Sequence, residues 1–336
     1  MLEEFRSLKP FFLSIAFFSF AFIFIVSLIL SARTLHIAPD DGNYLNHFHG
    51  NFYDPGNISV WLKLVDEPLW RLWANLLGGL FSSETSLRLT IFLGSFGLLY
   101  YSYKLKTEAW IFILLIFIFS QHLATQIYFN QIRQGFALTV FIFGLSKGFR
   151  TGIVTAFIAS LIHTSFVFVW LPMIIVWVTR EFKNWNIYFA IIVVVSFFLF
   201  FLNAVDISML SEYMGRRAFS YQFEGSLNYR FYLIWIPIPF LSLFIMKNYL
   251  ISPFDNLFWR FTLLYLFICI FFSFIHEAFS RLFYFTYLFI PLTISFGFPK
   301  KTPVILAVFW FAFIIGETFL DMESLYGRWM LILFNG

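Results

Sequence analysis

The sequence predicts an all-α polytopic membrane protein, and its composition supports this prediction in three ways. Of the 336 residues, 60% are hydrophobic and 24% aromatic, and the mean hydropathy is +0.82. Only 12% are charged, about half the share that is usual in a soluble domain. The apolar residues also occur in long runs, as membrane-spanning helices require. Since no stretch has the composition of a soluble domain, we expect a single integral membrane domain over residues 1–336.

The apolar runs place the expected spans, because about 20 apolar residues cross a bilayer. The first run is too long and too rich in Phe for a signal peptide, so we expect it to be retained. The expected spans are 11–31, 87–103, 109–129, 133–147, 187–203, 230–247, 256–276, 279–297 and 302–319. One further stretch, 151–179, is too long for one ordinary span and is interrupted by "HTS" at 163–165 and by Pro172.

The basic residues of the short loops indicate how the chain crosses. Cytoplasmic loops carry an excess of Lys and Arg. With the amino terminus inside, these loops all become cytoplasmic only if 151–179 crosses outward and returns. We therefore expect two short broken helices, 151–163 and 165–179, meeting near His163. Non-helical backbone at membrane depth is tolerated where it lines a cavity. The total is about eleven crossings, including these short helices, with the carboxyl terminus outside.

The cations that this topology places outside are almost all arginines. A guanidinium offers paired donors that suit phosphate, so the outer face is predicted to meet an anionic ligand. These cations are Arg33, Lys63, Arg71, Arg88, Arg133, Arg216, Arg217, Arg230, Arg281 and Arg328.

Two of the expected outer loops are long, at 32–86 and 204–229. Within the first, several apolar residues would share one face of a helix, which predicts an amphipathic helix lying on the membrane surface. They are Leu62, Val65, Leu69, Leu72, Trp73 and Leu76. The second loop is polar enough to cap a cavity.

The segment "FNQIRQGFA", 129–137, puts polar residues between apolar runs. Arg and Gln at membrane depth are costly and usually face a cavity or a partner. A structural ion pair or a helix-end anchor explains Arg133 equally well when it is taken alone. The topology, however, places Arg133, His163, Arg230 and Arg281 at similar depth on the outer side, which favours a shared site.

Three carboxylates are candidates for a general base: Asp40 and Asp41 in "PDDGNY", and Glu67 in "DEPLW". Adjacent carboxylates more often solvate a loop, but one beside an arginine-lined cavity can accept a proton. The chain has no CxxC, HExxH, GxSxG or P-loop spacing, which argues against standard metal, serine-hydrolase and nucleotide sites. "HFH" at 47–49 is a weak metal motif only. We expect no metal and no cofactor.

A resemblance to a known family joins these segments. "PDDGNYLNHF", "EPLW", "FNQIRQGFALTVFIFGL", "ASLIHTSFVFVWLP" and "SRLFYFTYLFIPL" follow in this order. Together they resemble the EpsG-type branch of the Wzy-like bacterial polysaccharide polymerases, over most of the chain. The IRQ and HTS segments are the most specific parts.

The resemblance implies a GT-C-like glycosyltransferase of the bacterial inner membrane with its site facing the periplasm. It would transfer a growing glycan from undecaprenyl pyrophosphate to the non-reducing end of a new lipid-linked repeat unit. Expected partners are the lipid-linked donor and acceptor, membrane lipid, a chain-length regulator and a flippase, but no nucleic acid. The catalytic candidates are Asp40, Asp41, Glu67 and His163. The candidates for binding substrate and pyrophosphate are Tyr44, Asn130, Arg133, Gln134, Arg216, Arg217, Arg230 and Arg281.

Three other functions remain open at this stage. An O-antigen ligase would also use outer Arg and His residues. A flippase for the lipid-linked unit would suit the broken helices, although no inverted repeat is visible. A membrane O-acyltransferase would use a His in an apolar helix, but His163 lies on the wrong side for a cytosolic acyl donor.

Overall fold

The computed structural model describes residues 2–36, 38, 40–52, 67–106, 109–119, 131–181, 237–271 and 282–320. This part of the chain contains helices and no strands, so the all-α prediction is confirmed for it. The α-helices are α1 (Leu2–Ser31), α2 (Asp41–Phe48), α4 (Pro68–Leu80), α5 (Ser83–Leu105), α6 (Trp110–Phe119), α8 (Ile132–Leu145), α9 (Phe149–Ile162), α10 (Val167–Val178), α13 (Pro237–Met246), α14 (Pro253–Phe271), α16 (Thr286–Ser295) and α17 (Lys301–Leu320). Two 3₁₀ turns, η3 (Thr164–Phe166) and η6 (Lys247–Tyr249), accompany them.

Most of the expected spans coincide with a helix. α1, α5, α8 and α17 cover their predicted runs to within a few residues, whereas α6, α13, α14 and α16 cover the described parts of theirs. The run 187–203 and the loop 204–229 lie outside the described residues. The number of crossings and the GT-C-like architecture stay predictions.

Within the ranges given above, no helix is both long enough and apolar enough to cross a membrane.

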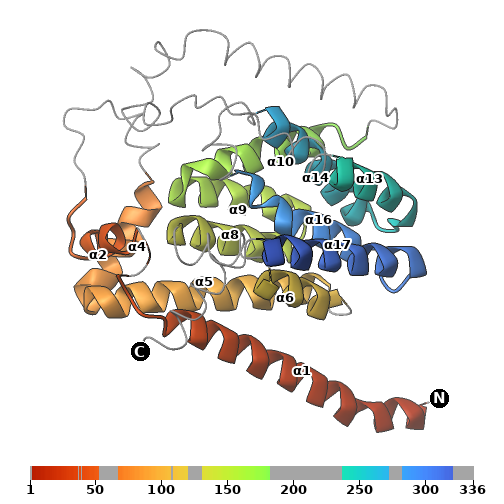
Figure 1. Cartoon of the computed structure of the whole chain (residues 1–336), viewed down its shortest axis with the longest axis horizontal. Coiled ribbons are helices and arrows are strands. Elements are labelled where there is room, and N and C mark those ends of the chain that lie inside the picture. Colours follow the sequence, from red (N-terminus) through yellow and green to blue (C-terminus); the bar gives the residue numbers. More distant parts are fainter. Residues whose placement is uncertain are drawn as a thin grey trace.

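Three neighbouring helices, α5, α8 and α9, form the part of the bundle that supports the site. α8 packs against both α5 and α9, and the three lie side by side in Figure 1. Small residues permit the close approach. A side chain at Gly144 of α8 would collide with Thr155 of α9, and one at Gly97 of α5 would press on Thr139 of α8.

The short turn between α8 and α9 fixes which helix ends are neighbours. Only Ser146–Gly148 separates the helices, and Gly148 has a φ of +133°, a conformation that residues with a side chain rarely adopt. The chain therefore reverses direction, and the first residues of α8 lie beside the last residues of α9. α2 and α4 pack at this same end of the bundle, where α4 contacts α9 (Figure 1).

The predicted break near His163 is confirmed. α9 ends at Ile162, His163 is extended with φ −147° and ψ 120°, and η3 leads into α10. α9 and α10 have 14 and 12 residues, so each is about 20 Å long or less. They also pack against each other. The break places His163 at the α2–α4 end of the bundle.

The predicted surface helix is partly corrected. It begins only at Pro68, which suits the first helical position, and Leu62 and Val65 lie outside the described residues. Trp70, Ala74 and Leu77 form its buried face, and Leu69 and Trp73 are half-buried against the core. Leu72 and Leu76 are exposed, as predicted, together with Leu80. Trp73 was assigned to the wrong face, because its ring stacks on Phe136 and its Nε1 donates to Thr90 Oγ1 over 3.0 Å.

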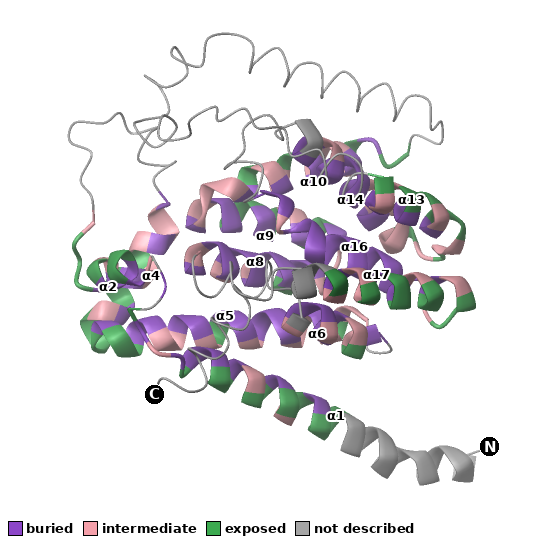
Figure 2. Ribbon diagram, in the orientation of Figure 1, coloured by how far each residue is buried: buried purple, intermediate pink, exposed green. Residues whose placement is uncertain are grey.

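Buried residues concentrate in the centre of the bundle, while apolar residues also cover parts of its surface. Figure 2 shows that buried side chains dominate α8 and α16, and that α1 and α17 carry many exposed ones. Several exposed residues of α1 are large and apolar, namely Phe17, Phe18, Phe20, Phe22, Phe24, Ile25, Leu28 and Ile29. Exposed apolar surface of this extent marks a contact with another apolar phase or partner.

The close contact at Gly144 makes a testable prediction. Gly144→Ala should destabilise the protein by about 1–3 kcal/mol, because its new methyl group overpacks against Thr155. Gly79→Ala in α4 is the matched control, since nothing lies within 4 Å of the methyl group it adds. It should be neutral or slightly stabilising. Thermal unfolding of both variants in detergent, followed by size-exclusion chromatography, provides the comparison. Equal melting temperatures would contradict the packing described here.

Candidate functional site

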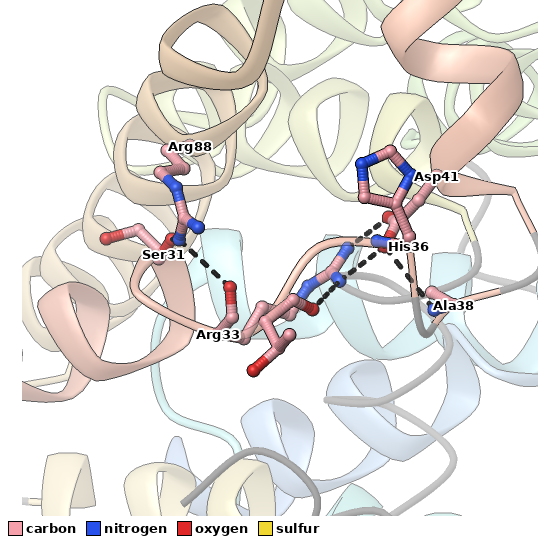
Figure 3. Close-up of polar contacts among 7 residues, drawn as sticks. Ser31, Arg33, His36, Ala38, Asp41 and Arg88 are labelled. Carbon is pink, nitrogen blue, oxygen red and sulfur yellow. Dashed lines mark hydrogen bonds and ion pairs between the residues drawn. The ribbon is translucent and has the colours of Figure 1, made fainter. Parts of the chain in front are cut away.

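The connection between α1 and α2 is held by a buried ion pair (Figure 3). The two terminal guanidinium nitrogens of Arg33, Nη1 and Nη2, donate to the two carboxylate oxygens of Asp41, with Nη1 2.7 Å from Oδ2. The backbone N–H groups of His36 and Ala38 also donate to Oδ2, over 3.0 and 3.3 Å. Both charged side chains are almost fully buried. Arg33 and Asp41 therefore neutralise each other and fix the entry to α2.

Arg88 ties the same connection to α5. Its Nη1 donates to the backbone carbonyls of Ser31 and Arg33, both at 2.9 Å (Figure 3). Arg33 and Arg88 thus hold the backbone and a carboxylate of the protein itself. The prediction that the outer arginines meet an anionic ligand is therefore corrected for these two, because their guanidinium groups bind groups of the protein.

The adjacent aspartates have different surroundings. Asp41 is buried and surrounded by hydrogen-bond donors of the protein itself, an arrangement that favours a structural role. Asp40 is partly exposed at the N-cap of α2, and its side chain does not cap the helix. The structure therefore separates two residues that the sequence left equivalent.

Glu67 is the centre of the candidate site. Its Oε2 forms an ion pair with Arg133 Nη1 at the start of α8. Its Oε1 lies 2.8 Å from His163 Nδ1 and accepts from the backbone N–H of Thr164 over 3.4 Å. One buried carboxylate thus joins the first turn of α8 to the break after α9. Glu67 itself has φ +55° and ψ 55°, an unusual conformation for a residue with a side chain, and such residues occur often at functional sites.

These contacts define the hydrogen positions on His163. A carboxylate paired with a guanidinium is ionised and only accepts hydrogen bonds. His163 Nδ1 must therefore donate its proton to Glu67, and in the neutral form of the ring Nε2 is then the acceptor nitrogen. A carboxylate that orients a histidine in this way prepares the opposite nitrogen to act as a general base.

Tyr44 of α2 closes one side of the cluster. The Arg133 guanidinium lies over its ring, 5.7 Å from the centroid, and Trp70 packs against the ring edge at 5.8 Å. Burial raises the pKa of the Tyr44 phenol, and the nearby Arg133 charge opposes this shift. Asp40 is close enough to add to the upward shift. The phenol is therefore neutral at ordinary pH and offers a proton donor beside Arg133.

Three buried polar atoms in the segments that carry Arg133 and His163 have no hydrogen-bond partner among the described residues. They are Gln131 Oε1, Arg133 Nε and Ser165 Oγ. Gln131 precedes α8 and Ser165 lies in η3, so both are within two residues of a side chain that binds Glu67. Buried polar groups are normally paired, so a buried atom that lacks a partner calls for an explanation, such as a bound water, ion or ligand.

The two histidines of "HFH" have structural partners. Trp70 Nε1 donates to His47 Nδ1 over 3.1 Å, and Ser83 Oγ lies 2.9 Å from His49 Nε2. The His47 ring also stacks on Phe52. These contacts bind α2 to α4 and α5.

The structure brings together four of the predicted site residues: Tyr44, Glu67, Arg133 and His163. Gln134 is buried in α8. The ion pair that the sequence offered as the simpler explanation of Arg133 is present, but Glu67 shares it with His163. The remaining candidates, Asn130, Arg216, Arg217, Arg230 and Arg281, lie outside the described residues.

Sequence reasoning missed the backbone N–H of Thr164 and the buried polar atoms of Gln131 and Ser165. Gln131 and Ser165 belong to the two segments that the sequence analysis singled out, so their positions next to Arg133 and His163 could have marked them as candidates. No sequence pattern marks a backbone N–H that becomes free where a helix breaks.

The described part of the chain is thus helical, and it holds a cluster in which one buried carboxylate contacts both a histidine and an arginine. The chain belongs to the EpsG family, whose sequence model matches residues 15–327. This family suggests a polysaccharide polymerase-like function. No curated protein and no solved structure matches the chain.

The different surroundings of the two aspartates predict different effects of substitution. Asp41→Asn should cost about 3–5 kcal/mol and strongly reduce the amount of folded protein, because it leaves the buried Arg33 charge unpaired. Asp40→Asn, its neighbour, should leave folding unchanged. Immunoblots of membranes and detergent melting curves of both variants measure the difference. If Asp41→Asn melts like the wild type, the structural assignment fails.

Proposed function

We propose that the protein polymerises a bacterial surface polysaccharide in the inner membrane, with its site facing the periplasm. The donor is a glycan chain on undecaprenyl pyrophosphate, and the acceptor is a new lipid-linked repeat unit that is extended at its non-reducing end. Membership of the EpsG family supports the class of reaction. The composition and the exposed apolar side chains of α1 support a membrane location. A flippase and a chain-length regulator are the proposed partners.

The observation that carries this proposal is the shared carboxylate of Glu67. Transfer to a sugar hydroxyl benefits from a base, since the hydroxyl has a high pKa. Departure of a lipid pyrophosphate benefits from a fixed cation, since negative charge develops on it. Glu67 joins one residue of each kind, His163 and Arg133, at one end of the bundle.

The roles follow from the contacts. His163 Nε2 takes the proton of the acceptor hydroxyl, whose oxygen bonds to the anomeric carbon of the donor. The bond between that carbon and the pyrophosphate oxygen breaks, and the pyrophosphate leaves with the electron pair. Glu67 orients His163 and stabilises the imidazolium that forms. Arg133 stabilises the leaving group, because a guanidinium pairs with two phosphate oxygens and stays charged when partly dry.

A ladder assay in cells tests these roles. His163→Ala should lower polymerisation by about 10²–10⁴-fold, the usual contribution of a positioned base. Arg133→Ala should lower it by about 10²–10³-fold. Arg133→Lys should be substantially impaired, because lysine keeps the charge but loses the paired donors. Arg180→Ala is the matched control, since Arg180 follows the carboxyl end of α10 and the carboxylate it pairs with in the described chain is that of its exposed neighbour Glu181.

Membrane levels of each variant should match the wild type by immunoblot. A normal ladder from His163→Ala or Arg133→Ala would refute the assigned role. Loss of the protein together with the ladder would indicate that Arg133 is structural. In a deletion strain, a single retained repeat unit indicates a polymerase. Complete loss of surface units indicates a flippase or ligase, and an unchanged ladder indicates a modifying enzyme.

The proposed orientation makes a separate prediction. In a Cys269→Ala background, a cysteine at position 183 should label from the cytoplasm and a cysteine at Asn51 from the periplasm. The native Cys269 is buried, so its removal simplifies the background. Asn51 is exposed beside α2, whereas position 183 lies outside the described residues. Periplasmic labelling at 183 would invert every later crossing and disprove the out-and-back path of 151–179.

A further inference from the structure

We propose that the pyrophosphate of the donor takes the place of Glu67 as the partner of Arg133. Glu67 then stays bound to His163, and this stronger contact prepares His163 to act as the base. The proposal rests on the proposed function and adds an order to it. The acceptor hydroxyl is deprotonated only after the donor has bound.

The first step of the argument concerns which residue moves. The Glu67 side chain is 5% exposed and is also held by His163 Nδ1 and the Thr164 N–H. The Arg133 side chain is 21% exposed and lies on the long, flexible arm of an arginine. Arg133 can therefore turn toward a ligand, while Glu67 keeps its contacts with His163 Nδ1 and the Thr164 N–H.

The second step concerns what draws Arg133 away. A pyrophosphate carries more negative charge than one carboxylate and matches the planar guanidinium donors. Arg133 Nε is buried with no partner in the described part of the chain, as are Ser165 Oγ and Gln131 Oε1. A pyrophosphate beside Arg133 would supply an acceptor for Arg133 Nε, and its oxygens could also accept from Ser165 Oγ.

The third step concerns the effect on His163. While Arg133 is bound, it neutralises Glu67 and weakens the carboxylate as an acceptor. Once Arg133 has moved, Glu67 still accepts from His163 Nδ1–H and from the Thr164 N–H, and the His163 Nδ1–H bond strengthens. The other charged or titratable groups near the cluster, Tyr44 and Asp40, do not replace Arg133, because neither is a cation. Glu67 is therefore a positioning residue that couples donor binding to the base.

Binding of inorganic pyrophosphate to the purified full-length protein tests the exchange by titration calorimetry. Glu67→Gln should bind about five- to tenfold more tightly than the wild type, although it fails in the ladder assay, because Arg133 no longer has a competing carboxylate. Arg133→Gln should lose binding. The gain from Glu67→Gln should also vanish in the Arg133→Gln background, as a coupled pair requires.

Asp40→Asn is the matched control for charge alone. Asp40 is a nearby carboxylate whose charge acts on Arg133 but which forms no ion pair with it in the described structure. Its removal should therefore change the affinity for pyrophosphate much less than Glu67→Gln does. Glu67→Asp, whose shorter side chain also loosens the pair, replaces Glu67→Gln if that variant does not fold. An affinity for Glu67→Gln that is equal to or weaker than the wild type, or equal to that of Asp40→Asn, would overturn the exchange.

A second measurement follows the histidine directly. Added pyrophosphate should move the His163 Nδ1–H resonance downfield, because its hydrogen bond to Glu67 becomes stronger. The resonance is assigned by its absence from His163→Gln. An unchanged resonance at saturating pyrophosphate, or no binding by either the wild type or Glu67→Gln, would overturn the exchange. The ladder assay decides separately whether the protein is a polymerase, so the two proposals can fail independently.

Discussion

The arrangement of the site depends on one carboxylate, that of Glu67. It is buried, and a buried charge is tolerated only when it is paired and hydrogen-bonded. Arg133, His163 and the Thr164 N–H provide this pairing from two other helical elements. Removal of any one of these three partners would leave the carboxylate less well satisfied. The same requirement that stabilises the cluster brings a cation and a histidine to one place.

The bundle supplies this arrangement through helix direction and close packing. α8 and α9 reverse across a three-residue turn, so the start of one helix lies beside the end of the other. Gly144 lets α8 and α9 approach closely at the far end of the pair from Glu67. The break at His163 then frees a backbone N–H, which would be occupied inside a continuous helix. The irregular segment thus supplies one of the contacts of Glu67, and the regular helices hold it in place.

Ion pairs in this protein serve two purposes, and their burial separates them. Arg33 and Asp41 are both almost fully buried and are surrounded by further hydrogen bonds, so exchange of either partner would be costly. The Arg133 side chain, in contrast, remains partly exposed. The first pair fixes the entry to α2, whereas the second is the one that we propose to exchange with an anion. Exposure, and not the presence of an ion pair, separates these two arginines.

The sequence by itself determined the helical class, most helix positions and the break near His163. It also marked Arg133, His163 and Glu67 as candidates, whereas Tyr44 was proposed from the family resemblance. The helix positions and the polar interruptions are local properties, set by runs of apolar residues and by polar residues within them. The tertiary structure alone decided that Glu67 binds both Arg133 and His163, which are 66 and 96 residues away. It also separated Asp41 from Asp40 and assigned Trp73 to the core-facing side of α4. Such choices depend on which helix ends meet, and that is fixed by packing between distant segments, which no local pattern encodes.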